Sequence, residues 1–414
     1  MYYFEGLDIV DFSKRTATPF FVISENIITK NCSILLRLTK SKPNTKIYYS
    51  LKTNYESRVL QTIRKMGLGA EVSGDLDMFL AEKAQFPHFD IIVDGTNKSD
   101  AFLKKCVEKN IQLINIDSID ELNRLNKIAK GQLLKVNIGL RIDPQVSSYD
   151  LRNIFLTTGQ RSYGLGSQEV RYLLNNFDKY SFVDIKGLLA HLTFSFVKPA
   201  YYQKSLKNLF SLAKQFKVRG VDIREINLGG GFPSQGIQHA FPFFSKFPVS
   251  LEHFIKAIER GYDANFRKTR LNLNISLEPG RSIMGNSAIL VGKIVEKKGR
   301  NVYTDILMND LGYRPLFKNR GFLIANKVKQ SPMEKVNIYS ASVNSFDKLF
   351  LNVWSPSIER GDILVIFGVG AYSIPYANQF SRPRSAVYFL NSSKKVELIR
   401  KKETLFDVTR NQVW

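Results

Sequence analysis

The segment Ile47-Tyr48-Tyr49-Ser50-Leu51-Lys52-Thr53-Asn54 is an apolar, strand-like run that ends in a lysine and two polar residues. Seven more short apolar runs follow it at helix-sized intervals, at residues 69–73, 91–95, 113–118, 136–143, 185–193, 225–230 and 274–280. Between two of these runs, residues 120–130 place Leu122, Leu125 and Ile128 on one helical face. Eight strands that alternate with helices predict a (β/α)8 barrel, in which active groups gather at the carboxyl ends of the strands. A doubly wound open sheet is the alternative, but such a sheet needs fewer strands than the eight runs in this sequence.

The chain has 414 residues, whereas a barrel needs about 250. After Gly280 the pattern changes to short strand-like runs separated by Gly, Asn and Lys turns, at residues 288–296, 302–308, 335–341, 362–367, 385–390 and 395–399. These runs predict a β-sandwich or open barrel, and residues 19–23 could join either domain. We therefore expect a barrel domain at residues 25–283 and a second, mostly β domain formed by residues 1–24 and 284–414.

The formal net charge of +23 is typical of proteins that bind nucleic acid, anionic membranes or acidic substrates, and also of a lysine-rich proteome. Basic residues are spread along the chain, and the clusters at residues 297–300 and 400–402 are short, without interleaved aromatic side chains. The spread of the basic residues therefore argues against nucleic-acid binding. The net charge is compatible with an anionic substrate or an acidic partner.

Cysteine and histidine usage argues against a metal site. Cys32 and Cys106 are the only cysteines, too few for a disulfide framework or a cysteine metal site, and the four histidines lack zinc-site spacing. The amino terminus lacks the basic start and apolar core of a signal peptide, and no apolar segment approaches a membrane-spanning length. We expect a cytoplasmic protein without bound metal and without membrane contact.

Lys52 ends the first barrel strand, where a lysine can form a Schiff base with an aldehyde once its surroundings hold the amine deprotonated. An isolated lysine is more often a solvated surface residue. Gly229-Gly230-Gly231 offers bare backbone N–H groups to a phosphate, although three glycines could equally form a turn. Arg281, in Leu277-Glu278-Pro279-Gly280-Arg281, offers a guanidinium to the same phosphate.

Glu278 and His191 also lie at predicted strand ends. A buried Glu278 carboxylate needs a partner, which is either a protonated ring nitrogen or a barrel lysine. His191 is either a core histidine or a ring that stacks on an aromatic cofactor. An imine-forming lysine, a glycine cradle, an arginine, a carboxylate and a stacking histidine together match what pyridoxal 5'-phosphate needs.

On these residues the sequence resembles the barrel-type pyridoxal-phosphate decarboxylases, the family of ornithine, arginine, diaminopimelate and carboxynorspermidine decarboxylases. Arg161-Ser162-Tyr163-Gly164 takes the place of the family's Lys-Phe-Gly segment. The similar segments are Tyr49-Ser50-Leu51-Lys52-Thr53-Asn54, Glu71-Val72-Ser73-Gly74 with Asp77, Gly229-Gly230-Gly231-Phe232, Glu278-Pro279-Gly280-Arg281 and Gly370-Ala371-Tyr372.

The resemblance implies that Lys52 holds the cofactor, with Glu278 on its pyridine nitrogen and His191 stacked on its ring. It also implies a homodimer with shared active sites. The residues expected to contact the cofactor besides these three are Glu71, Gly229, Gly230, Gly231, Gly280, Arg281 and Tyr372, the last also a catalytic candidate. The residues expected to contact substrate are Arg314, Asn344, Asp347 and Phe380, of which Asp347 is also a catalytic candidate.

Three positions depart from the family pattern. Val343 stands where the family has a catalytic cysteine, so the proton donor must be Lys52, Tyr372 or water. Asn344 replaces an acidic residue that faces the distal end of the substrate, which argues against free ornithine or lysine. Phe194 replaces a serine that contacts the phosphate, with Thr193 or Ser195 as possible substitutes.

The function predicted from the sequence is α-decarboxylation of a non-standard amino acid carried on a larger anionic molecule. A nucleotidyl peptide or an acidic carrier protein would fit, as in antibiotic maturation or another specialised pathway. The alternatives are an amino-acid racemase or epimerase on a related barrel, and a non-catalytic regulatory relative of the decarboxylases, including those of polyamine metabolism.

Overall fold

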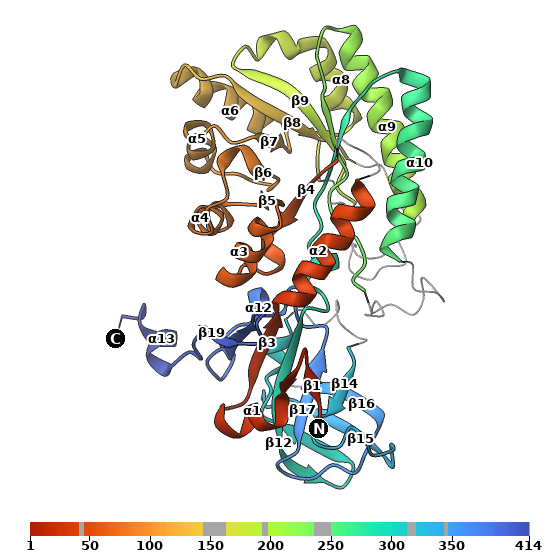
Figure 1. Ribbon diagram of the computed structural model, residues 1–414. Helices are drawn as coiled ribbons and strands as arrows, with labels where there is room; N and C mark the ends of the chain where they lie inside the picture. Colours follow the sequence, from red (N-terminus) through yellow and green to blue (C-terminus); the bar gives the residue numbers. More distant parts are fainter. Residues whose placement is uncertain are drawn as a thin grey trace.

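The computed structural model describes residues 1–40, 45–143, 163–192, 198–235, 250–312, 320–342 and 347–413. Figure 1 shows a barrel ringed by helices, with a β-rich part beneath it and helix α13 at one side. Arg161, Ser162, the 193–195 segment, Arg314, Val343 and Asn344 lie outside the described residues.

Eight parallel strands close into a barrel in the order β10-β11-β4-β5-β6-β7-β8-β9, which confirms the predicted fold class. Each predicted run overlaps one strand. The strands are β4 (Thr45–Ser50), β5 (Gly69–Val72), β6 (Ile91–Val93), β7 (Leu113–Ile116), β8 (Val136–Arg141), β9 (Val183–Leu189), β10 (Glu225–Asn227) and β11 (Asn274–Leu277). Because all eight strands are parallel, their carboxyl ends meet at one face of the barrel.

Helices cover the outside of the barrel (Figure 1). Helix α6 shows how the sequence sets their bounds. Ser118 accepts a hydrogen bond from the backbone nitrogen of Glu121 and so caps the helix that was expected at residues 120–130. The helices are α2 (Glu25–Thr39), α3 (Ser57–Lys65), α4 (Asp75–Lys83), α5 (Asp100–Glu108), α6 (Ile119–Gly131), α8 (Ser167–Asn176), α9 (Pro199–Val218), α10 (Leu251–Thr269) and α11 (Arg281–Met284).

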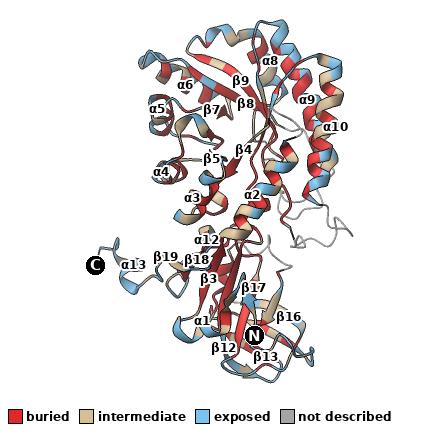
Figure 2. Ribbon diagram, in the orientation of Figure 1, coloured by how far each residue is buried: buried red, intermediate tan, exposed pale blue. Residues whose placement is uncertain are grey.

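The barrel interior is filled by side chains rather than open. Tyr48, Ile92 and Leu113 form a buried cluster inside it. A Cβ added to Gly69 would lie 2.5 Å from the Tyr48 ring, so this position has room only for glycine. Figure 2 shows the barrel strands buried and the outer faces of α9 and α10 exposed. The interior is therefore a packed core, and in such barrels the active groups gather at the carboxyl face.

The second part is mostly β, as predicted. Strand β3 pairs with β12 in antiparallel and with β18 in parallel orientation, so the segment expected at residues 19–23 joins this part. The predicted division at residues 25 and 283 stays a prediction. The elements are β1 (Tyr3–Phe4), β2 (Leu7–Asp8), α1 (Ile9–Arg15), β3 (Phe20–Ser24), β12 (Ala288–Lys298), β13 (Asn301–Thr304), β14 (Phe322–Ile324), β15 (Glu334–Tyr339), β16 (Lys348–Ser355), β17 (Ile363–Phe367), α12 (Ser373–Tyr376), β18 (Ala386–Leu390), β19 (Val396–Arg400) and α13 (Leu405–Thr409).

Some boundaries differ from the predicted ones. The run at 302–308 is a strand only as far as Thr304, and a 3-10 turn begins at Met308. Strands β14 and β16 were not predicted, and β16 is largely exposed, so it lacks the apolar alternation that reveals a buried strand. Among the described residues, no helix is both long and apolar enough to cross a membrane.

Candidate active site at the carboxyl face of the barrel

Every barrel strand contributes a polar or charged side chain at its carboxyl end. Because the strands are parallel, these side chains converge on one face. The residues are Lys52 after β4, Glu71 on β5, Asp94 after β6, Asp117 after β7, Arg141 on β8, His191 after β9, Asn227 on β10 and Glu278 after β11. We refer to these eight residues as the strand-end ring.

Lys52 lies in a 3-10 turn directly after β4. Its Nζ donates hydrogen bonds to both carboxylate oxygens of Glu71, at 2.8 and 2.9 Å, and to Oγ of Ser73 at 2.9 Å. Burial alone would lower the pKa of Lys52, but the carboxylates of Glu71, Asp94 and Glu278 outweigh burial and raise it above its ordinary value. Without cofactor, Lys52 is therefore an ammonium.

Glu278 is buried behind the backbone of the glycine segment. Its backbone nitrogen donates to the carbonyl oxygen of Gly229 at 2.8 Å, and Nδ2 of Asn227 donates to its Oε1 at 2.8 Å. Burial raises the pKa of Glu278 well above its ordinary value, and the nearby carboxylates of Asp94 and Glu71 raise it further. Glu278 is therefore a weaker acid than an ordinary glutamate, which suits a carboxyl group that shares a proton with a ring nitrogen.

The ring of His191 lies against the backbone of Gly229. Gly229 has a φ of +64°, and a Cβ there would be 2.0 Å from Cδ2 of His191, so both conformation and space require glycine. Burial lowers the pKa of His191 to about 4, helped by the positive charges of Arg141 and Lys52. His191 is thus a neutral imidazole at physiological pH and can stack on an aromatic ring.

An anion-binding corner adjoins His191. A Cβ on Gly230 would lie 2.5 Å from the carbonyl oxygen of Glu278, so no side chain covers the backbone at this point. The guanidinium of Arg281 lies 5.4 Å from the centre of the Tyr372 ring, and burial lowers its pKa. Bare backbone and a buried cation are what a phosphate group requires.

Tyr372 reaches this corner from the β-rich part of the chain. Its backbone nitrogen donates a hydrogen bond of 2.8 Å to the carbonyl oxygen of Thr53, the residue after Lys52. A Cβ on Gly280 would lie 1.9 Å from Oγ1 of Thr53, so the predicted Gly280 is also packed here. The structure therefore brings the predicted residues Lys52, Glu71, His191, Gly229, Gly230, Gly231, Glu278, Gly280, Arg281 and Tyr372 to one face of the barrel.

Two predicted substrate residues lie in the β-rich part. Asp347 accepts a hydrogen bond of 2.6 Å from Oγ of Ser340. Phe380 follows helix α12, and 46% of its surface is exposed. Their predicted contacts to substrate stay predictions, as do those of Arg314 and Asn344, which lie outside the described residues.

Four members of the strand-end ring were missed by the sequence analysis. Asp94, Asp117, Arg141 and Asn227 each fall inside or directly beside a predicted run. The signal was available, because each barrel strand presents its last polar residue to the same face. None of the four residues belongs to a known chemical motif, so motif patterns alone do not single them out.

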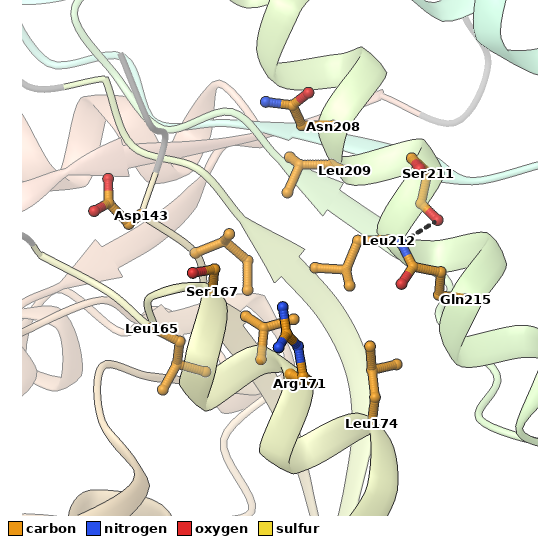
Figure 3. Close-up of a pocket in the computed structure, with 12 residues that line it drawn as sticks. Asp143, Leu165, Ser167, Arg171, Leu174, Asn208, Leu209, Ser211, Leu212 and Gln215 are labelled. Atoms are coloured by element: carbon orange, nitrogen blue, oxygen red, sulfur yellow. Dashed lines mark hydrogen bonds between the residues drawn. The ribbon is translucent and has the colours of Figure 1, made fainter. Parts of the chain in front are cut away.

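A separate cavity of about 340 Å³ lies outside the barrel, between helices α8 and α9. Figure 3 shows Arg171, Ser167 and Asp143 on one side of it and the residues of α9 on the other. None of the strand-end ring lines it. We therefore assign the chemistry to the strand-end ring, where charged groups with shifted pKa values are in contact.

Comparison with known proteins agrees with this arrangement. The family model for the pyridoxal binding domain of pyridoxal-dependent decarboxylases matches residues 29–285. Diaminopimelate decarboxylase of Aquifex aeolicus is 26% identical over 408 residues, which cover 97% of this chain and 93% of that protein. The protein of the same name from Methanocaldococcus jannaschii is 25% identical and covers 100% of this chain and 95% of that protein.

Solved structures show the same fold. The crystal structure of the M. jannaschii diaminopimelate decarboxylase superposes with a TM-score of 0.90 at 24% identity, covering 100% of this chain and 96% of that chain. An arginine decarboxylase from Paramecium bursaria Chlorella virus superposes with a TM-score of 0.75 at 17% identity, covering 92% and 98%. At these identities the superpositions establish the fold alone.

Proposed function

The chain belongs to the family of pyridoxal-dependent decarboxylases, and we propose that its substrate is an amino acid with a second anionic group at the end of its side chain. Membership makes the protein a carboxy-lyase that uses pyridoxal 5'-phosphate. The substrate proposal is supported by the similarity of this chain to diaminopimelate decarboxylases, which extends over 97% to 100% of its length.

The described residues fit pyridoxal phosphate. Lys52 offers the amine for covalent attachment, and the backbone at Gly230 and Gly231, with Arg281, offers a place for the phosphate. The carboxyl group of Glu278 suits a pyridine nitrogen, because a protonated ring needs a carboxylate partner and the raised pKa of Glu278 favours sharing the proton. When bound, the protonated cofactor ring accepts the electron pair that remains after CO2 leaves the substrate.

The surrounding residues would position these groups and hold their protons. His191 would present a neutral imidazole to the cofactor ring, since a charged one would repel a protonated ring. Glu71 and Ser73 hold Nζ of Lys52 at a fixed position. Asn227 fixes the Glu278 carboxyl by its hydrogen bond of 2.8 Å. Each reactive group is thus held by a neighbour from another strand, as a preorganised site requires.

Arg281 and Arg320 bring two cations to the corner beside Tyr372. Arg320 donates from Nη2 to the carbonyl oxygen of Leu311 at 2.8 Å and to Oγ of Ser373, the residue after Tyr372, at 2.9 Å. Burial and the positive charge of Arg281 lower the pKa of Arg320 to about 9. A phosphate group carries about 1.5 to 2 negative charges at pH 7, so these two cations would balance the phosphate of the cofactor. The diaminopimelate decarboxylases that resemble this chain support a substrate with a distal carboxylate, because diaminopimelate carries one.

The prediction of an amino acid on a larger anionic carrier is a second version of this proposal. It is supported by the net charge of +23. A panel of free diaminopimelate, ornithine, lysine, arginine and an amino acid linked to a nucleotide separates the two versions by CO2 release. Turnover of diaminopimelate alone supports the first version, and preference for the conjugate supports the second. Equal turnover of ornithine would contradict both.

We also propose the homodimer that the resemblance implies. Its support is the exposure of two aromatic side chains that follow Tyr372, with 56% of Tyr376 and 46% of Phe380 accessible. Light scattering after size exclusion measures the assembly. A monomer at enzyme concentrations that give full activity would contradict the proposal.

A further inference from the structure

The amino face of the barrel, at the opposite end of the strands from the strand-end ring, has a cavity of its own. The cavity has a volume of about 270 Å³ and is lined by residues of strands β7 to β11 and of the turns before them. Pockets for drug-sized molecules typically measure about 300–1,000 Å³, so this cavity suits a smaller ligand. No member of the strand-end ring is among the described residues that line it.

Glycines on β8 and β9 explain how the barrel is filled above this cavity. A Cβ on Gly139 would lie 2.0 Å from Oδ1 of Asn115, and a Cβ on Gly187 would lie 3.0 Å from Cδ2 of Leu113. The side chains of β7 therefore occupy the space that β8 and β9 leave free. Leu113 also lines the cavity and forms its apolar wall.

A β-bulge places Lys186 at the cavity. Ile138 and Gly139 on β8 pair with Ile185 and Gly187 on β9, so Lys186 is an extra residue between the two pairs. Bulges are rare between parallel strands, and they redirect side chains beside functional sites. Lys186 lines the cavity, which therefore contains an ammonium group.

Arg224 brings a second cation to the cavity. Its backbone nitrogen donates a hydrogen bond of 2.8 Å to the carbonyl oxygen of Lys186, so the two residues are neighbours on adjacent segments. Nε of Arg224 donates to Oδ2 of Asp222 at 2.8 Å. Asp222 holds the exposed guanidinium at the rim and offsets part of its charge. The pair of cations favours a ligand with a carboxylate group.

Glu225 adds a carboxyl group to the same cavity. Its Oε1 is buried and accepts no hydrogen bond from the described residues. Burial raises the pKa of Glu225, and the hydroxyl of Ser276 and the ammonium of Lys46 offset only part of this effect. In the described part of the chain no ion pair joins Glu225 to Arg224, which pairs with Asp222 instead. A buried carboxyl group in these surroundings is stabilised by a cation that a ligand brings.

Lys46 does not supply that cation fully, because other groups hold it. Its Nζ forms an ion pair of 2.5 Å with Asp90 and lies 5.1 Å from the centre of the Tyr48 ring. Lys46 is not among the described residues that line the cavity. The ammonium partner of Glu225 is therefore left to the ligand.

Three amide side chains complete the lining. Gln112, Asn137 and Asn274 are exposed and lie at the rim of the cavity. An amide both donates and accepts hydrogen bonds, so these side chains can bind either end of a polar ligand.

We propose that this amino-face cavity is a second binding site, which takes a small molecule carrying both a carboxylate and an ammonium group, such as a free α-amino acid. Lys186 and Arg224 bind the carboxylate, and Glu225 binds the ammonium. The site is separate from the strand-end ring, so the inference does not depend on the proposed function.

Three probes of similar shape test this charge pattern. Norleucine carries both charged groups, hexanoate carries only the carboxylate and pentylamine carries only the ammonium. The protein is first incubated with pyridoxal phosphate and reduced with borohydride, which prevents imine formation at Lys52. Ligand-observed NMR titration then gives the Kd of each probe. Norleucine should bind about ten-fold more tightly than either other probe, because it alone makes both charged contacts.

Two substitutions should affect the probes differently. Glu225→Gln should weaken norleucine and pentylamine by about ten-fold and leave hexanoate unchanged. Lys186→Met should weaken norleucine and hexanoate by a similar factor and leave pentylamine unchanged. A variant that fails to fold would lose all three probes, so selective loss separates a binding role from a structural one.

Lys135→Met and Asp184→Asn are the matched controls. These two residues form an ion pair of 2.8 Å beside the same strands, β8 and β9, and neither lines the cavity. Both controls should leave the three Kd values unchanged.

Three results would overturn the inference: no saturable binding of norleucine, equal affinity for norleucine and hexanoate, or norleucine binding that survives both substitutions. If Glu225→Gln does not fold, Lys186→Met decides alone, because Lys186 is a half-buried bulge residue. Failure of the proposed function is seen separately, as absence of reduced cofactor on the protein, and it leaves the effects of Glu225→Gln and Lys186→Met unchanged.

Discussion

Asn54, two residues after Lys52, donates a hydrogen bond of 2.9 Å from Nδ2 to the carbonyl oxygen of Gly370, and the two residues are 316 positions apart in the sequence. Oδ1 of the same side chain accepts from the backbone nitrogen of Glu56 at 3.1 Å. One fully buried amide thus connects the barrel lysine segment to the β-rich part that carries Tyr372. The position of Tyr372 relative to Lys52 depends on this contact.

Replacing Asn54 should therefore affect both stability and the site. Asn54→Ala leaves the Gly370 carbonyl without this donor, and we expect the free energy of unfolding to fall by about 1–3 kcal/mol. Retention of pyridoxal phosphate during dialysis should fall as well. Asn176→Ala removes an exposed amide that donates within one helix, and it should change neither quantity. Equal effects of the two substitutions in urea unfolding would contradict the role of Asn54.

Lys52 is expected to be the only point of covalent cofactor attachment. After borohydride reduction, peptide mass spectrometry should find the cofactor on Lys52 and on no residue of Lys52→Ala. Lys46→Ala is the control, because Lys46 lies on β4, the strand that precedes Lys52, but forms an ion pair with Asp90. Attachment at another lysine, or undiminished attachment in Lys52→Ala, would refute the assignment.

Gly229 should tolerate no side chain, for two separable reasons. Gly67 has a similar φ of +77° but nothing within 4 Å of an added Cβ, whereas a Cβ at Gly229 would meet His191. Gly67→Ala should cost roughly 1 kcal/mol from backbone strain alone. Gly229→Ala should cost about 1–3 kcal/mol more, because it adds a clash in a packed site. Equal unfolding free energies for the two variants would mean that His191 moves away without cost.

His191 should make stability depend on pH in a defined window. Its pKa is about 4 when folded and 6.5 as its ordinary value, so between these values the unfolded chain binds more protons. The stability due to His191 is therefore present above pH 6.5 and is lost as pH falls to 4, by at most roughly 3 kcal/mol. His191→Gln should flatten this part of the curve of unfolding free energy against pH.

Asp310 should make stability depend on pH in the opposite direction to His191, over a similar pH range. Burial raises its pKa from 3.8 to about 6, so the folded chain binds more protons between these values. Its contribution is present below pH 3.8 and is lost as pH rises through 6. Asp310→Asn should therefore steepen the same stretch of the stability curve that His191→Gln flattens. Identical changes in both variants would show that neither group is responsible.

The local parts of the site were accessible from sequence. Eight apolar runs at helix-sized intervals indicate a parallel barrel, because hydrophobic periodicity and turn residues are local properties of the chain. In a parallel barrel all carboxyl strand ends lie at one face, so the sequence alone predicts that Lys52, His191, Gly229 and Glu278 lie together. Strand β16, largely exposed, lacked that periodicity and was not predicted.

The sequence alone determined the fold class, the lysine and the glycine, arginine and glutamate motifs of the site, because each depends on neighbours along the chain. Only the tertiary structure decided that Asp94 and Arg141 join that site, that Gly370 and Tyr372 pack on the Lys52 segment, and that Lys52 is an ammonium rather than an amine. The physical reason is that a protonation state reflects the sum of burial and charge through space. Residues distant in sequence enter that sum as strongly as adjacent ones.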